Sequence, residues 1–205
     1  PEGGRRIMGM EKEKPWVATG LAEVGLAGRV AGSDRLFFHA ALYSNFARDR
    51  AMADALEAAL LRPRFERLEV VSLDPVARPP YWDEFRQILR QDMPAAAMQR
   101  EFSVSAAFLD ALASRLPHKV RLYVTAAMPL APILLLDDVV IAGHYAHSPA
   151  AAPLGHWLVI PADVAALTEL AEEGARPESL DPADVGAYRL ICDCLAARLA
   201  SRRLA

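Results

Sequence analysis

The fold is decided by one stretch, residues 35–73, whose sequence is RLFFHAALYSNFARDRAMADALEAALLRPRFERLEVVSL. It begins with an almost continuous apolar run over residues 35–43, which is typical of a strand buried on both faces. Asn45 can cap the helix that follows, whose apolar residues recur at helical spacing until Pro63. Residues 68–73 then form a second strand. Strand, helix and strand at this spacing predict a βαβ unit with parallel strands.

The rest of the chain continues this alternation. Helices are predicted over residues 81–91, 104–116, 162–173 and from Asp181 onward, and strands over residues 120–125, 133–136, 139–142 and 157–160. We therefore expect an α/β fold with a mixed, mainly parallel sheet flanked by helices on both faces. Residues 16–205 are expected to form a single domain, preceded at residues 1–15 by a disordered tail or an expression remnant.

The amino-acid composition indicates which classes of partner are expected and which are not. The 205 residues are 53% hydrophobic and 24% charged, which is typical of a globular protein. The net charge of −3 argues against direct nucleic-acid binding, because proteins that bind phosphate backbones usually carry a basic face. No apolar run reaches the roughly 18 residues that a membrane span needs, so no membrane partner is expected. Cys192 and Cys194 make no disulfide framework, which favours a reducing, cytoplasmic location.

The densest group of candidate functional side chains follows the strand predicted at residues 133–136. Loops at strand ends are where α/β proteins keep their sites. The group consists of Asp137, Asp138, Gly143, His144, Tyr145, His147, Ser148 and His156. In an enzyme, His144 or His147 could act as base or nucleophile, oriented by Asp137 or Asp138. The alternative for the two aspartates, which we favour, is a tight turn between strands.

A second group follows the first strand, where the N–H groups of the next helix can bind an anion. The residues expected to bind a ligand are His39, Tyr43, Ser44, Asn45, Tyr145, Ser148 and His156. The competing interpretation makes His39 a core residue and Ser44 and Asn45 helix caps. A metal held by His144 and His147 is not expected, because this spacing on a loop fixes no geometry. Phosphate-loop, dinucleotide-binding and nucleophile-elbow motifs are absent from the sequence, so no cofactor is expected.

The run LAPILLLD at residues 130–137 resembles the motif of the phospholipase D superfamily. That motif is H-x-K, four apolar residues and Asp, followed by a glycine-containing GSxN-like stretch. Asp137 matches the aspartate, and Gly143 fits the glycine one residue early. The family's histidine, however, falls on Leu130 and its lysine on Pro132.

The resemblance implies a phospholipase D-like half that lacks its nucleophile. In that family the histidine attacks phosphorus and the lysine steadies the phosphate charge, and leucine and proline can do neither. Members with one motif form their site across a two-fold dimer, so the resemblance also implies a homodimer in which residues 129–148 face their counterparts.

Three functions follow as expectations. The first is a non-catalytic, dimerising module that binds a small anionic ligand or a protein partner. The second is a phosphodiesterase or related hydrolase with a site rebuilt from His144, His147 and Asp137, in which Ser44 and Asn45 cradle the anion. The third is a nucleic-acid-associated protein whose DNA-binding part lies elsewhere or is supplied by a partner.

Overall fold

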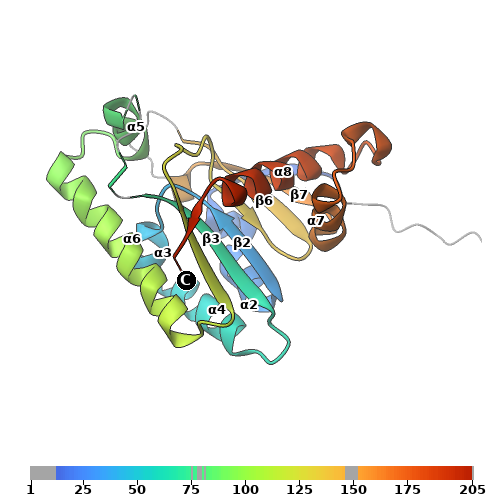
Figure 1. Cartoon of the computed structure of the whole chain (residues 1–205), viewed down its shortest axis with the longest axis horizontal. Coiled ribbons are helices and arrows are strands. Elements are labelled where there is room, and N and C mark those ends of the chain that lie inside the picture. Colours follow the sequence, from blue (N-terminus) through green and yellow to red (C-terminus); the bar gives the residue numbers. More distant parts are fainter. Residues whose placement is uncertain (1–12, 75, 78–79, 81, 146–151, 205) are drawn as a thin grey trace, which may run out of the picture.

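The computed structural model describes residues 13–74, 76–77, 80, 82–145 and 152–204, and within them the chain forms a single eight-stranded sheet with helices on both faces (Figure 1). The strands are β1 (Trp16–Thr19), β2 (Arg35–His39), β3 (Arg67–Leu73), β4 (Val120–Thr125), β5 (Ile133–Leu135), β6 (Val139–Ala142), β7 (His156–Pro161) and β8 (Arg202–Arg203). The α-helices are α1 (Leu21–Val24), α2 (Leu26–Gly32), α3 (Ser44–Arg48), α4 (Arg50–Leu61), α5 (Trp82–Leu89), α6 (Ala95–Arg115), α7 (Val164–Glu172) and α8 (Val185–Leu199).

The strand order is β1-β7-β6-β5-β2-β3-β4-β8. Strands β2, β3 and β4 run parallel, with Arg35 in register with Arg67 and Leu68 in register with Val120. The βαβ unit predicted from residues 35–73 is therefore confirmed. It contains two helices, α3 and α4, where the sequence predicted one.

The α/β class and the mixed sheet with helices on both faces are confirmed, but parallel pairing does not predominate. Five of the seven neighbouring pairs are antiparallel and two are parallel. The physical reason lies in the connections of the second half. Only residues 136–138 join β5 to β6, and a parallel crossover needs a dozen residues or more.

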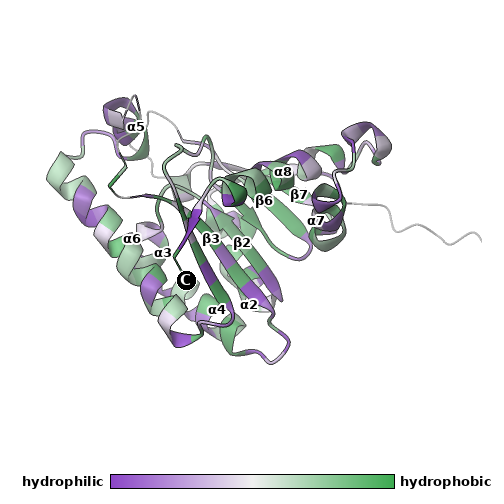
Figure 2. Ribbon diagram, in the orientation of Figure 1, coloured by the Kyte–Doolittle hydropathy of each residue, from purple (hydrophilic) through white to green (hydrophobic). Residues whose placement is uncertain are grey.

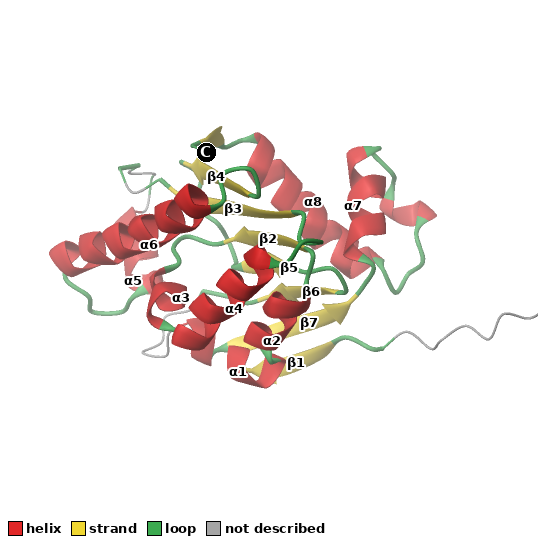
Figure 3. Ribbon diagram, turned by 90° about the horizontal axis from the view of Figure 1, so that it is seen from below, coloured by secondary structure: helices red, strands yellow, loops and turns green. Residues whose placement is uncertain are grey.

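Each face of the sheet has its own core. The helices α2, α4 and α6 cover one face, and α7 and α8 cover the other (Figure 3). Alternation along β2 divides its side chains between the two, with Phe38 in the first core and Phe37 in the second. Figure 2 shows that the strands are largely hydrophobic but become hydrophilic at the ends where β2 and β3 begin.

Within the described ranges, no helix combines the length and the apolar character that crossing a membrane would require.

Candidate functional site

Tyr43 fixes the backbone where β2 turns into α3. Its hydroxyl donates a hydrogen bond to the carbonyl of Val71 (2.9 Å), and its N–H donates to Ser105 Oγ (2.8 Å). Burial raises the pKa of Tyr43 well above its usual value. The hydroxyl proton of Tyr43 is therefore already used in a hydrogen bond within the protein, and only the ring is available to a ligand.

Glu101 of α6 is a buried carboxylate at the same turn. Ser44 Oγ donates to it at 2.6 Å, and both terminal nitrogens of Arg48 donate to it, Nη1 at 2.8 Å. The hydrogen bond from Arg48, helped by the one from Ser44, lowers the pKa of Glu101 to about 2 despite its burial. Ser44 therefore points at a protein carboxylate and forms no anion cradle in this structure.

Arg90 follows α5 and is the second cation near Glu101. Only 14% of its side chain is exposed, and its Nη2 lies 3.9 Å from the Glu101 carboxylate. It donates hydrogen bonds to Asn45 Oδ1 (3.0 Å) and to the carbonyl of Leu89 (2.7 Å). Burial lowers the pKa of Arg90. Two arginines meet one carboxylate here, so the cluster carries one positive charge in excess.

A cavity of about 50 Å³ opens beside Arg90, and we call it the arginine cavity. Its polar lining includes Arg90, Asn45 and Tyr145, and its apolar lining includes Leu42, Leu134 and Trp157. Tyr145 Oη accepts a hydrogen bond from the N–H of Ala41 (2.9 Å), and burial raises the pKa of Tyr145. The tyrosine therefore keeps its own proton, which it can donate.

The histidines do not converge on this cavity. His144 and His156 are exposed, and their rings stack on each other at 6.3 Å. His39 is buried on the other face of the sheet, and its Nδ1 has no hydrogen-bond partner. Burial lowers the pKa of His39, although the negative charge of Asp193 acts in the opposite direction. The predicted His147 and Ser148 lie outside the described residues. In the part of the chain that the structure describes, no group of three or more potential metal ligands gathers.

Asp137 lies at the far end of the β5–β6 hairpin from His144. Its two carboxylate oxygens accept the backbone N–H groups of Asp34 (2.6 Å) and Arg35 (2.9 Å). Asp137 lies five positions beyond Pro132, which is next to Gly143, and this length of extended chain corresponds to about 17 Å. The turn interpretation therefore describes Asp137 better than a catalytic role beside His144.

The positions that the sequence analysis aligned with the histidine and lysine of the phospholipase D motif carry no reactive group. Leu130 is 93% exposed, and Pro132 lines the arginine cavity. Gly143 donates its N–H to the carbonyl of Pro132 (2.9 Å), and a Cβ at this position would lie 2.9 Å from the ring of Trp157. The glycine is therefore required by close packing at this position.

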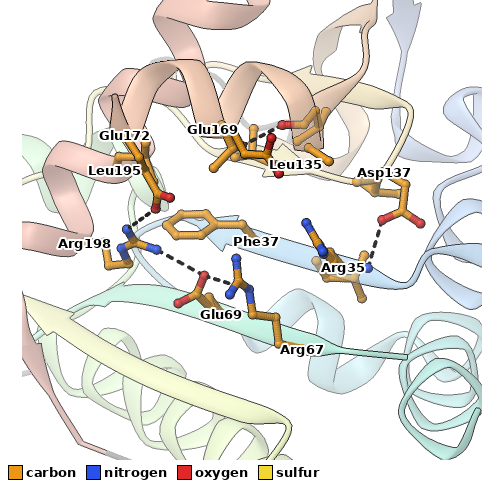
Figure 4. Close-up of a pocket in the computed structure, with 15 residues that line it drawn as sticks. Arg35, Phe37, Arg67, Glu69, Leu135, Asp137, Glu169, Glu172, Leu195 and Arg198 are labelled. Carbon is orange, nitrogen blue, oxygen red and sulfur yellow. Dashed lines mark hydrogen bonds and ion pairs between the residues drawn. The ribbon is translucent and has the colours of Figure 1, made fainter. Parts of the chain in front are cut away.

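A larger pocket lies at the opposite end of the sheet, where β2 and β3 begin, beneath α7 and α8 (Figure 4). We call it the polar pocket. Its volume is about 190 Å³, and Arg35, Arg67, Glu69, Glu169 and Arg198 are among the residues that line it. Sequence reasoning missed this group except for Asp137 at its rim. The available signal was Glu69, a single carboxylate in the middle of an apolar strand.

Comparisons with known proteins define the class of fold but no family. Neither a family model nor a curated relative matches this sequence. Among solved structures, the chain is similar to phosphatidylserine synthase of Haemophilus influenzae, with a TM-score of 0.50 and 12% identity over 90% of this chain and 46% of that one. That enzyme belongs to the phospholipase D superfamily, so the likeness supports a phospholipase D-like fold.

The chain is also similar to TrmBL2, an archaeal chromatin protein whose structure shows a novel mode of DNA binding. The TM-score is 0.43 and the identity 13%, over 82% of this chain and 53% of that one. The chain thus spans about half the length of both neighbours.

Two expectations about partners do not stand. The exclusion of direct nucleic-acid binding, which was drawn from the net charge of the chain, is wrong. The net charge of a whole chain does not decide what one of its faces binds. Nor does either comparison support the homodimer. That expectation depended on a motif in which the reactive positions are Leu130 and Pro132.

Proposed function

We propose that this chain is a non-catalytic domain of phospholipase D-like fold that binds a small acidic ligand in the arginine cavity. The observation that carries the proposal is Arg90, a largely buried cation that lines an apolar cavity and shares the carboxylate of Glu101 with Arg48.

The charge balance of the cavity explains the choice of ligand. A charged group away from water is costly unless it is paired and hydrogen-bonded. Glu101 already accepts close hydrogen bonds from Arg48 and Ser44, so its attraction to Arg90 acts across 3.9 Å. A carboxylate in the cavity would complete the pairing of Arg90, with further hydrogen bonds from Tyr145.

The size of the cavity limits the ligand further. Sites for drug-sized ligands occupy roughly 300–1,000 Å³, several times the 50 Å³ of the arginine cavity. The ligand that fits is a short-chain carboxylic acid, whose acidic group meets Arg90 and whose apolar body meets Leu134 and Trp157.

The lining of the cavity favours binding over catalysis. Among the described residues, the cavity is lined by no histidine, cysteine, serine or carboxylate that could serve as a nucleophile or base. The residues that align with the histidine and the lysine of the phospholipase D motif are Leu130 and Pro132, and their side chains are chemically inert. In the enzyme alternative, His144 would act at the surface and far from Asp137.

Calorimetric titration of the full chain with acetate, propionate and butyrate tests the proposal. We expect saturable binding, and an affinity loss of about tenfold or more in Arg90→Gln, since a charge-assisted hydrogen bond is removed. Arg100→Gln is the matched control, because Arg100 is an exposed arginine of α6 that does not line the cavity. Equal binding by both variants, or no binding of any of the acids by the parent chain, would overturn the proposal.

Turnover is measured in parallel with bis(4-nitrophenyl) phosphate. We expect none above background. Hydrolysis that is lost in His144→Ala would establish the rearranged phosphodiesterase and refute the non-catalytic assignment.

A further inference from the structure

The polar pocket brings together two arginines from adjacent parallel strands. Arg35 and Arg67 are in register where β2 and β3 begin, and neighbouring strands lie about 4.8 Å apart. Like charges at adjacent positions of a sheet destabilise it unless anions neutralise them. Arg35 has Glu66 at 2.6 Å, and Arg67 has Glu69 at 3.5 Å. Figure 4 shows both guanidinium groups directed from the strands into the pocket.

Glu69 fixes the floor of the polar pocket. It is buried in β3 and has Arg198 at 3.3 Å, Arg67 at 3.5 Å and Arg121 at 3.7 Å. Arg198 is held in turn by Glu172 of α7 at 3.1 Å. This network surrounds one carboxylate with three arginines, so the floor has cationic character and little freedom to rearrange.

The roof of the pocket carries the opposite charge. Glu169 of α7 lines the pocket, and within the described part of the chain no cation lies within ion-pair distance of it. The pKa of Arg35 is raised mainly by its hydrogen bond with Glu66, with smaller contributions from the charges of Asp137 and Glu169. Glu169 therefore faces the cationic floor across the pocket without touching it (Figure 4).

Between floor and roof the pocket has an apolar wall. Phe37, Leu135 and Leu195 line it. The volume of about 190 Å³ is below that of drug-sized sites and suits a small metabolite. A ligand that matches this lining needs an acidic group for the floor, a cationic group for the roof and a short apolar body between them.

We propose that the polar pocket binds a zwitterion of the α-amino acid class. Its carboxylate is held by Arg35 and Arg67, its ammonium group pairs with Glu169, and its side chain contacts Phe37 and Leu195. Charge-assisted hydrogen bonds at both ends give the selectivity, because a ligand that lacks one charge leaves the corresponding wall unpaired. This site lies at the other end of the sheet from the arginine cavity and does not depend on the function proposed there.

Calorimetric titration with L-alanine, L-leucine and L-glutamine tests the inference on the full chain. We expect at least one of them to bind, and its acid-only and amine-only analogues, such as propionate and ethylamine for alanine, to bind about tenfold more weakly or not at all. Binding of propionate as tight as that of alanine would overturn the inference, as would failure of all three amino acids. The comparison of propionate with alanine is repeated in Arg90→Gln, in which propionate no longer binds the arginine cavity.

Glu169→Gln is the decisive variant, because an exposed side chain without an ion pair can be replaced without harm to folding. We expect it to weaken amino-acid binding about tenfold. Glu173→Gln is the matched control, since Glu173 is exposed at the end of the same helix and does not line the pocket. An unchanged affinity in Glu169→Gln, or an equal loss in Glu173→Gln, would refute the assignment of the ammonium site.

Discussion

The two ends of the sheet handle buried charge in different ways. At the arginine cavity, a single carboxylate serves two arginines, and one of them, Arg90, is 14% exposed and lines an apolar space. At the polar pocket, Glu69 also serves several arginines, but Arg67 and Arg121 are 36% and 41% exposed and retain contact with water. The comparison teaches that similar groups of residues can leave one arginine largely buried beside an apolar space at one end of the sheet and keep two arginines partly hydrated at the other.

Removal of Glu101 should give the largest effect. Glu101→Ala leaves Arg90 buried without an anion and removes the acceptor of Ser44 and Arg48, so we expect a loss of about 4 kcal/mol in the free energy of unfolding. Urea denaturation measures it. The matched control is Glu57→Ala, which breaks an exposed pair with Arg115 and should change the stability very little. Equal losses of unfolding free energy in the two variants would contradict the claim that the buried Glu101 cluster stabilises the fold more than a surface ion pair does.

The pH dependence of unfolding should show the same cluster. The pKa of Glu101 is lowered from 4.5 to about 2 in the folded chain, so its contribution to stability is fully present above pH 4.5 and is lost as the pH falls toward 2. A lowering of this size corresponds to about 3 kcal/mol. Chemical denaturation between pH 5 and 2.5 should therefore show a steeper loss of stability in the parent chain than in Glu101→Gln. Parallel curves for the two proteins would contradict the lowered pKa.

Glu69→Gln should cost less, although Glu69 is as well buried as Glu101. The amide retains the shape of the side chain, Arg67 and Arg121 are hydrated, and Arg198 keeps Glu172 as a partner. We expect a loss of about 2 kcal/mol in the free energy of unfolding, measured by urea denaturation at neutral pH. A loss larger than that of Glu101→Ala would reverse the comparison between the two ends of the sheet.

The sequence predicted the parts of this molecule that depend on local pattern. The apolar strand predicted at residues 35–43, which the structure shows as β2, and the helical spacing before Pro63 predicted the βαβ unit, because each element carries its own periodicity. The parallel preference failed in the second half because the three-residue connection at residues 136–138, which forces a hairpin, was interpreted only as a turn. The edge strand β8 has only two residues, which are too few for a periodic signal.

The candidate site was predictable only where it follows a strand end. Asn45 and Tyr145 line the arginine cavity, as residues of strand-end loops often do. Glu101 belongs to α6 and Arg90 directly follows α5, positions where a charged residue is usually solvated. Only the packing of α6 against α3 and the contact of Arg90 with Asn45 bury them. The pairing of Arg35 with Arg67 likewise depends on strand register, which no local pattern records.

Glu169→Gln should have the smallest effect on stability. In the absence of ligand, Glu169 makes no ion pair within the described residues, so we expect the free energy of unfolding to change by less than about 0.5 kcal/mol. Arg90→Gln at the arginine cavity should change the free energy of unfolding by more, because Asn45 Oδ1 then loses the hydrogen bond that Arg90 donates to it. Thermal and urea denaturation of both variants without ligand separate the two cases. A clear destabilisation by Glu169→Gln would show that the carboxylate already has a structural partner, and the polar pocket would then lack the free anion that a ligand's ammonium group needs.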